Sequence, residues 1–293
     1  MQSAPRRRVS HPAIASSCTA MIMRAGDTRF SRFQRYVLTK QEMTSHIGDT
    51  PFESASTAAS TAGNAVSALH LHLGLDRPSP NLQPTTQSIA QGRNRPCMEW
   101  CLIHRLIRHS GGITGTVEYN LPGSQHVLSV PPPKAGYRVV TTASSKHTSY
   151  LQSLGASAVI DYTLPSTTLL STLQSHGPYY RTFSAASQVV LGDLVSAQGG
   201  GSFLATMGVR PGVVLPPAVE GFFAQYLDDF LKPVHGEFTR WFYWEWLETA
   251  IRTGSLRLAR VEVLPGGLEA IESGLRKLEK GVSSLKLIVD PSA

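Results

Sequence analysis

The sequence predicts an α/β protein with a doubly wound parallel sheet, and two observations carry this prediction. Short runs of β-branched and apolar residues alternate with helical segments through the second half of the 293-residue chain. The segments between successive strands are long enough to hold a helix, as a connection between parallel strands requires. Such alternation is typical of a sheet that carries helices on both faces.

The net charge of the chain lies in its first forty residues. The sequence has 27 Lys and Arg against 20 Asp and Glu, a formal charge of +7. Residues 1–40 hold eight basic residues and one acid, so the other residues balance at 19 of each sign. A nucleic-acid-binding domain carries its basic residues on the folded body, so nucleic acid is not expected as a partner.

Residues 1–29 are predicted to form a disordered basic leader. Residues 1–26 contain no acid and are rich in Arg, Ser and Ala, a composition that also resembles a mitochondrial transit peptide. Cys18, Cys97 and Cys101 are too few for a disulfide framework, which favours a reducing compartment. No apolar run approaches the roughly 18 residues of a membrane span. A cytoplasmic location is therefore predicted, with the mitochondrion as the alternative.

A strand and a helix are predicted next. Residues 33–38 are rich in aromatic and β-branched side chains, which favours a strand. A helix is expected to begin after Thr50, which can cap it, with Pro51 in its first turn and Glu53 three residues after the cap. Small residues continue this helix, and Gly74 is expected to end it.

The segment from residue 76 to residue 135 is irregular. Residues 76–97 are polar and rich in Pro, Ser and Gln, so a loop is predicted. Residues 100–104 are predicted to form a short buried strand. A glycine-rich stretch follows, and it leads to three consecutive prolines, Pro131 to Pro133, which exclude a helix there.

A regular βαβ pattern begins after these prolines. Residues 137–143 and 158–162 predict buried strands on either side of a helix over residues 147–154. A further helix and strand are expected over residues 188–197 and 202–207. This is the repeat on which the doubly wound sheet is predicted.

The C-terminal part is predicted to be helical and then mixed. Helices are expected over residues 222–230 and 238–252, and the second holds three of the four tryptophans. A core or subunit-interface position explains that aromatic helix better than a ligand cage does. A strand, a helix and a closing strand are expected over residues 260–264, 268–280 and 285–289.

Several kinds of catalytic or metal site are absent from the sequence. Cys97 and Cys101 have no second pair of cysteines, and the ten histidines form no H-E-x-x-H motif, so no metal site is predicted. No G-x-S-x-G turn is present for a hydrolase nucleophile. No Gly-Lys-Ser/Thr is present for a P-loop.

A dinucleotide site is the chemistry that remains. Such a site needs a glycine turn where the pyrophosphate meets a helix N-terminus, and Gly111, Gly112 and Gly115 are the candidates. An acid after the second strand would select the ribose 2′-hydroxyl of NAD, but Ser144 and Lys146 stand there with another serine between them. Hydroxyl groups and a cation suit the 2′-phosphate of NADP, with an ordinary polar loop as the alternative.

These residues resemble the medium-chain dehydrogenase/reductase superfamily. Residues 136–144, 154–156 and 161–162 are similar to its zinc-independent fungal members, which include quinone-reductase-like proteins and trans-acting enoyl reductases. Four further blocks agree in order and spread the match over most of residues 30–293. They are residues 33–37, residues 52–62, residues 199–203 and residues 267–289.

The resemblance divides the chain into four parts. The leader, 1–29, is followed by a remnant of a GroES-like β domain at 30–50 and by a Rossmann-like cofactor domain at 51–255. That domain holds the irregular insert 76–135, and the strand-helix-strand of 256–293 returns to the substrate domain. Most of the GroES-like domain and the helix after the glycine turn are expected to be missing, as in a mis-predicted gene or a decayed copy.

The resemblance implies an oxidoreductase that uses NADP(H) to reduce an enoyl, enone or quinone substrate by hydride transfer, as in fungal secondary metabolism. It implies a small-molecule substrate and a homodimer or a polyketide synthase as partner, and it names no catalytic acid. The alternative is an inactive remnant or a protein-binding module without cofactor binding. Because the substrate domain and the helix after the glycine turn are expected to be missing, weak or undetectable NADPH binding and negligible turnover are predicted for the chain as written. The implied cofactor-binding residues are Thr61 at the nicotinamide, Ser144 and Lys146 at the 2′-phosphate, Gly111, Gly112 and Gly115 at the pyrophosphate, and Tyr162.

Overall fold

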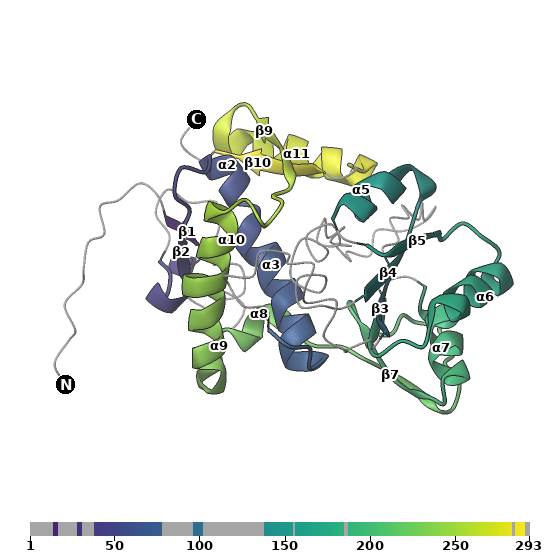
Figure 1. Ribbon diagram of the computed structural model, residues 1–293. Helices are drawn as coiled ribbons and strands as arrows, with labels where there is room; N and C mark the ends of the chain where they lie inside the picture. Colours follow the sequence, from purple (N-terminus) through teal and green to yellow (C-terminus); the bar gives the residue numbers. More distant parts are fainter. Residues whose placement is uncertain are drawn as a thin grey trace.

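The computed structural model describes residues 14–16, 28–30, 38–77, 96–101, 138–154, 156–184, 187–282 and 285–290. It contains a six-stranded parallel sheet with the strand order β5-β4-β3-β6-β7-β8, and Figure 1 shows this sheet in the right-hand part of the molecule. The chain builds one half of this sheet and then crosses to build the other, which confirms the predicted doubly wound α/β fold. The strands are β3 (Pro96–Cys101), β4 (Arg138–Ala143), β5 (Ala158–Asp161), β6 (Thr182–Ser184), β7 (Gly201–Ala205) and β8 (Val219–Phe222).

The sequence predicted some strands of this sheet correctly and missed others. β4, β5 and β7 lie where their apolar runs predict them. β3 begins four residues before the predicted strand at 100–104, of which residues 102–104 lie outside the described part of the chain. β6 and β8 were not predicted, because they have three and four residues and are held by their neighbours in the sheet.

Helices cover both faces of the sheet, since successive strand residues point to opposite sides. Val139 of β4 belongs to the same buried cluster as Leu151, whereas Val140 shares the other cluster with Leu173 and Leu191. Burial on both faces explains why β4 does not alternate buried with exposed residues: Val139, Val140, Thr141 and Thr142 are all buried. The flanking elements are η4 (Ser145–His147), α5 (Thr148–Ser153), α6 (Ser166–His176), which was not predicted, and α7 (Gln188–Ala197).

The helix predicted after Thr50 is present, with a different cap. Pro51 occupies the cap position, and its carbonyl accepts the backbone N–H of Ala55 at 2.9 Å. Gly74 ends the helix as predicted, with a positive φ of 66° that favours glycine. The helix comprises α2 (Phe52–Ala55), α3 (Ala58–Val66) and a π-helical turn labelled η3 (Ser67–His72).

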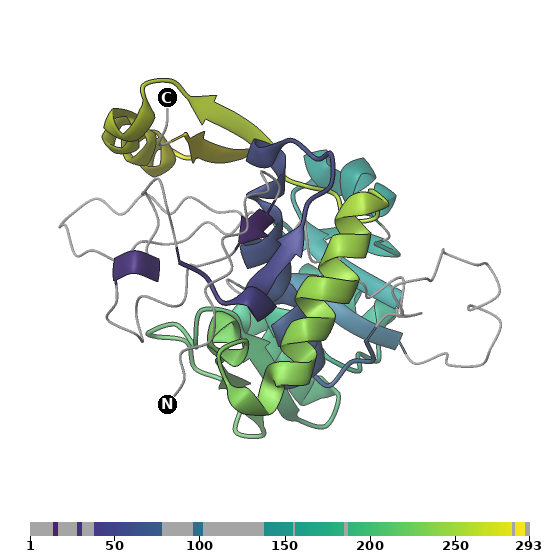
Figure 2. The same cartoon turned by 90° about the vertical axis from the view of Figure 1, so that its left-hand side faces the viewer.

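The tryptophan-rich helix packs against α3. Trp241 and Trp246 are buried, whereas Trp244 is 43% exposed. The small side chains of α3, such as Ala58 and Ala62, allow these large rings to approach closely, so the helix is a core helix as predicted. It runs without a break through α9 (Gly236–Arg240), η6 (Trp241–Leu247) and α10 (Glu248–Arg252), as Figure 2 shows.

The C-terminal residues form a separate strand-helix-strand unit. Two parallel strands, β9 (Arg260–Leu264) and β10 (Leu285–Val289), carry the helix α11 (Ala270–Lys280), which follows the turn η7 (Gly267–Glu269). All three elements lie where the sequence predicts them. Figure 1 shows this unit beside α2.

Several elements depart from the predictions or lie outside them. The helix predicted at 222–230 is wrong in its first part, because β8 runs to Phe222 and only a short helix follows. The strand predicted at 33–38 lies outside the described residues except for Leu38. No described helix is long and apolar enough to cross a membrane. The remaining elements are β1 (Ile14–Ser16), which pairs antiparallel with β2 (Thr44–His46), η1 (Thr28–Phe30), η2 (Gln41–Met43), α8 (Tyr226–Asp229) and η5 (Pro233–His235).

Candidate functional site

The carboxyl edge of the six-stranded sheet is the candidate site. The strand order reverses between β3 and β6, because the chain leaves β5 at one edge and returns to the middle of the sheet to form β6. In open parallel sheets the loops diverge at such a reversal, and the crevice outside the carboxyl ends binds the ligand. The fold therefore places the candidate site before any side chain is considered.

Ser184 lies at this reversal point. It is the last residue of β6, and it stands in register with Cys101 of β3 and Ala205 of β7. Ser184 is fully buried, and its hydroxyl has no hydrogen-bond partner among the described residues. A buried polar group without a partner is costly, so Ser184 is an unusual residue at the strand reversal. The sequence did not reveal it because β6 was not predicted.

The second corner of the site lies at the ends of β4 and β5. Ser144 follows β4 and is partly exposed, and Lys146 is exposed in the turn that opens α5. Tyr162 follows β5, is partly buried, and donates its backbone N–H to the carbonyl of Ala143 at 3.4 Å. The structure thus brings these three predicted residues to neighbouring strand ends, through the pairing of β4 with β5.

A carboxylate that was not predicted also lies at this corner. Asp161 ends β5, and its Oδ1 accepts hydrogen bonds from the backbone N–H of Thr163 at 2.9 Å and from the Thr163 hydroxyl at 2.7 Å. These bonds, and hydrogen bonds from Ser145, hold the pKa of Asp161 below its usual value. The carboxylate is therefore ionised, and it contacts Ser145 in the turn after β4, although the end of β4 itself carries no acid.

Thr61 lies elsewhere, on α3. It is 5% exposed, and its Oγ1 accepts a hydrogen bond from Nζ of Lys286 at 2.6 Å. Lys286 belongs to β10, in the C-terminal unit, and it was not singled out by the sequence. Gly111, Gly112 and Gly115, the remaining predicted residues, lie outside the described part of the chain.

A buried glutamine fastens the loop that follows β7 at the same edge. Gln188 is fully buried; its Nε2 donates to the carbonyl of Gly208 at 2.8 Å, and its Oε1 accepts the backbone N–H of Arg210 at 2.9 Å. The loop also presents the apolar side chains of Met207 and Val209 to solvent. An ordered loop with exposed apolar side chains is suited to contact an apolar molecule.

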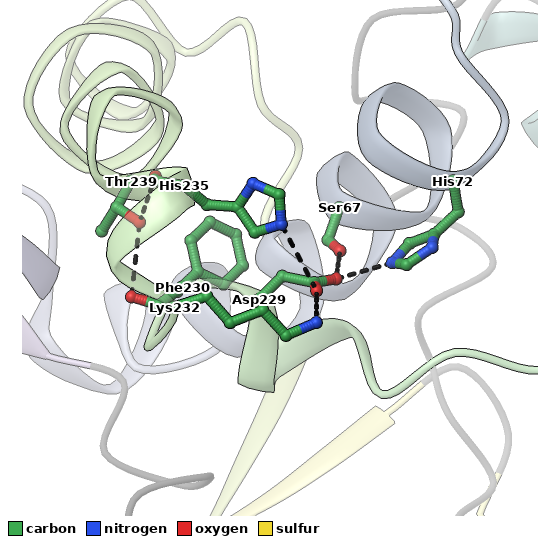
Figure 3. Close-up of polar contacts among 7 residues, drawn as sticks. All are labelled: Ser67, His72, Asp229, Phe230, Lys232, His235 and Thr239. Carbon is green, nitrogen blue, oxygen red and sulfur yellow. Dashed lines mark hydrogen bonds and ion pairs between the residues drawn. The ribbon is translucent and has the colours of Figure 1, made fainter.

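A second polar cluster surrounds Asp229, at the end of α8 (Figure 3). Its side chain is 1% exposed, and it accepts hydrogen bonds from Ser67 and His72, both at 2.6 Å, and from Lys232 at 2.7 Å. Burial opposes ionisation of Asp229, but the bonds from His72, Lys232 and Ser67 outweigh it and hold its pKa well below the usual range. Ser67 and His72 each donate to the carboxylate of Asp229 and not to one another, so they do not form a serine–histidine pair of the kind that activates a nucleophile. The cluster instead anchors α8 to the turn η3.

Two other features do not mark the site. A shallow hollow of about 460 Å³ is lined by Gly201, Ser202 and the segment from Pro217 to Glu220, at the amino ends of β7 and β8 and thus at the opposite edge. Among the described residues no group of three or more His, Cys, Asp or Glu side chains is arranged to hold a metal ion.

The fold is that of the medium-chain dehydrogenase/reductase superfamily. Solved structures of an alcohol dehydrogenase, quinone oxidoreductases and enoyl reductases share it with this chain. The quinone oxidoreductase of Escherichia coli in complex with NADPH superposes with a TM-score of 0.55 and 9% identity, over 85% of this chain and 69% of that one. No family model matches the chain.

Sequence relatives are fungal reductases and dehydrogenases. The trans-enoyl reductase himH of Aspergillus japonicus is 28% identical over 267 residues, which are 89% of this chain and 69% of that protein. The dehydrogenase azaJ of Aspergillus niger is 33% identical over 168 residues, which are 53% of this chain and 46% of that protein. These relatives confirm the resemblance that the sequence blocks predicted, and the chain spans less than half of the second one.

Proposed function

We propose that this chain is an NADP(H)-dependent oxidoreductase of the medium-chain type that reduces an enoyl, enone or quinone substrate without zinc. The observation that carries the proposal is the position of Ser144, Ser145 and Lys146 directly after the second strand of a doubly wound sheet. Hydroxyl groups and an ammonium group bind a phosphate, whereas a carboxylate at this position would bind the 2′-hydroxyl of NAD. The himH relative and the NADPH complex of the E. coli structure support the same class of reaction.

The described residues fit a dinucleotide at this edge. Ser144, Lys146 and Tyr162 follow the carboxyl ends of β4 and β5, next to the strand reversal. Ser144, Lys146 and Tyr162 would hold the phosphate end, and Thr61 the nicotinamide end. When bound, the reduced nicotinamide supplies the hydride. The protein then orients the substrate, excludes water with the loop after β7, and presents hydrogen-bond donors to the oxygen on which negative charge develops.

Partner and location follow from the same proposal. A trans-acting enoyl reductase acts on a chain carried by a polyketide synthase, so such a synthase is the proposed partner, with a cytoplasmic location. The domain boundaries at residues 30, 51 and 256 stay part of this proposal.

Titration of the purified chain with NADPH and NADH tests the proposal. We expect saturable NADPH binding, followed by nicotinamide fluorescence, that is at least tenfold tighter than NADH binding, and NADPH oxidation when an enone or a quinone is added. Equal affinity for the two cofactors would contradict the assignment of the 2′-phosphate site. Absence of binding to either one would favour the alternative of a protein-binding module without cofactor.

A further inference from the structure

Lys286 connects the C-terminal unit to α3. Its Nζ donates to Oγ1 of Thr61 at 2.6 Å and to the carbonyl of Thr57 at 3.1 Å. Thr57 and Thr61 lie one turn apart and are buried at 0% and 5% exposure. A second bond joins the same parts, because the backbone N–H of Ala259 donates to the Thr57 hydroxyl at 3.3 Å. The ammonium group is thus held in a fixed place on α3.

The lysine changes what the Thr61 hydroxyl can do. A threonine inside a helix commonly donates its hydroxyl hydrogen to the carbonyl four residues earlier. For Thr61 that carbonyl belongs to Thr57 and accepts from Lys286, and no described residue accepts a hydrogen bond from Thr61. Since Oγ1 already accepts from the ammonium group, its hydrogen is left for an acceptor outside the described residues. The usual bond is present at Thr172, Thr239 and Thr253.

The segment before β9 also contacts the helix that follows β4. Nη1 of Arg257, shortly before β9, donates to the hydroxyl of Ser153, the last residue of α5, at 3.4 Å.

We propose that Lys286 is a positioning residue that directs the Thr61 hydroxyl toward the carboxamide oxygen of a bound nicotinamide. An ammonium donor polarises the hydroxyl that accepts from it, and this makes the hydroxyl a stronger donor. A neutral amide oxygen is the acceptor that suits such a group. The inference rests on the proposed NADPH-binding function and adds to it a residue from the opposite end of the sequence.

Two ligands separate this role from general binding. NADPH carries the carboxamide, whereas adenosine 2′,5′-bisphosphate carries the 2′-phosphate and lacks the nicotinamide. We expect Thr61→Val and Lys286→Met each to weaken NADPH binding about tenfold, the loss expected for one polarised hydrogen bond, with no change in bisphosphate binding. Thr61→Ser keeps the hydroxyl and should bind NADPH as the unaltered chain does. The double variant should be no weaker than either single one, because both remove the same bond.

Matched controls make the outcomes distinct. Lys277→Met removes a lysine of the same unit that contacts Glu262, and it should change neither affinity. Unaltered NADPH affinity in Lys286→Met, or equal weakening of both ligands, would overturn the positioning role. If Lys286→Met fails to fold, Lys286→Gln, which keeps a neutral donor, takes its place. If the unaltered chain binds neither ligand, the proposed function fails and this inference fails with it. If the unaltered chain binds both ligands, and Thr61→Val and Lys286→Met bind them as the unaltered chain does, only the inference fails.

Discussion

Asp161 places a negative charge beside the residues proposed to bind the 2′-phosphate. Its hydrogen bonds to Thr163 and Ser145 lower its pKa, so the carboxylate is ionised at neutral pH. A phosphate at this corner would meet that charge as well as the ammonium group of Lys146. We therefore expect Lys146 to decide the balance, because it is the cation of the Ser144–Ser145–Lys146 turn.

Replacement of Lys146 tests this balance. Lys146→Glu would leave two carboxylates facing the 2′-phosphate, and we expect NADPH affinity to fall by roughly tenfold or more while NADH affinity changes by less than about twofold. Fluorescence titration at constant ionic strength measures both. Lys280→Glu, an exposed change of the same charge on α11, is the control. A parallel fall in NADH affinity would show that Lys146 does not contact the 2′-phosphate.

At the scale of elements, the Asp229 cluster joins α8 to the π-helical turn after α3. Ser67 and His72 come from that turn, and Lys232 comes from the segment after α8 (Figure 3). The folded pKa of Asp229 is depressed, so its contribution to stability is complete above the unfolded pKa of about 4 and is lost as the pH falls below that value.

Asp229→Asn should therefore lower the free energy of unfolding at neutral pH. We expect a loss of roughly 3 kcal/mol, the size found when one member of a buried charged pair is removed. The variant should also lose less stability than the unaltered chain when the pH is lowered from 5 to 3, since it has no carboxylate to protonate. Urea unfolding at several pH values measures this, with Asp193→Asn, exposed on α7, as the control. Identical acid dependence in the two chains would contradict the role of Asp229.

Packing between α3 and the tryptophan-rich helix gives a second prediction for the elements. Ala62 is fully buried in the cluster that contains Phe242 and Trp246. Ala62→Leu adds volume where the helices approach closely, and we expect it to destabilise the fold by about 1–3 kcal/mol. Asn64→Leu, at a partly exposed position of the same helix, should cost much less. Thermal unfolding compares the two, and equal losses would mean that α3 is not closely packed at Ala62.

For the whole molecule, metal chelation tests the zinc-independent proposal. The described residues hold no set of ligands arranged for a metal ion. Removal of a structural metal lowers stability, because metal binding is coupled to folding. A chain without such a metal should therefore keep its thermal midpoint and its NADPH affinity after treatment with EDTA. A drop in either quantity that is restored by zinc would show that a metal takes part.

Local sequence alone was enough for much of the architecture. The runs of β-branched and apolar residues at β4, β5, β7, β9 and β10 predicted strands, because such side chains are enriched in strands. Gly74 predicted the end of a helix, because glycine readily adopts the positive φ that a helix end often requires, and its φ is 66°. The alternation of these elements then predicted the doubly wound sheet, and the serines and lysine after β4 predicted a phosphate-binding corner.

Tertiary structure decided the features that depend on distant partners. β6 has three residues, and its pairing with β3 and β7 makes it a strand and brings Ser184 to the strand reversal. Asp161 joins the phosphate corner because β5 pairs with β4. Lys286 reaches Thr61 across 225 positions of the sequence. Local sequence determines which residues are able to form a strand, a helix or a charged group, whereas only the folded chain determines which of these groups meet, because pairing and burial join residues that no local pattern links.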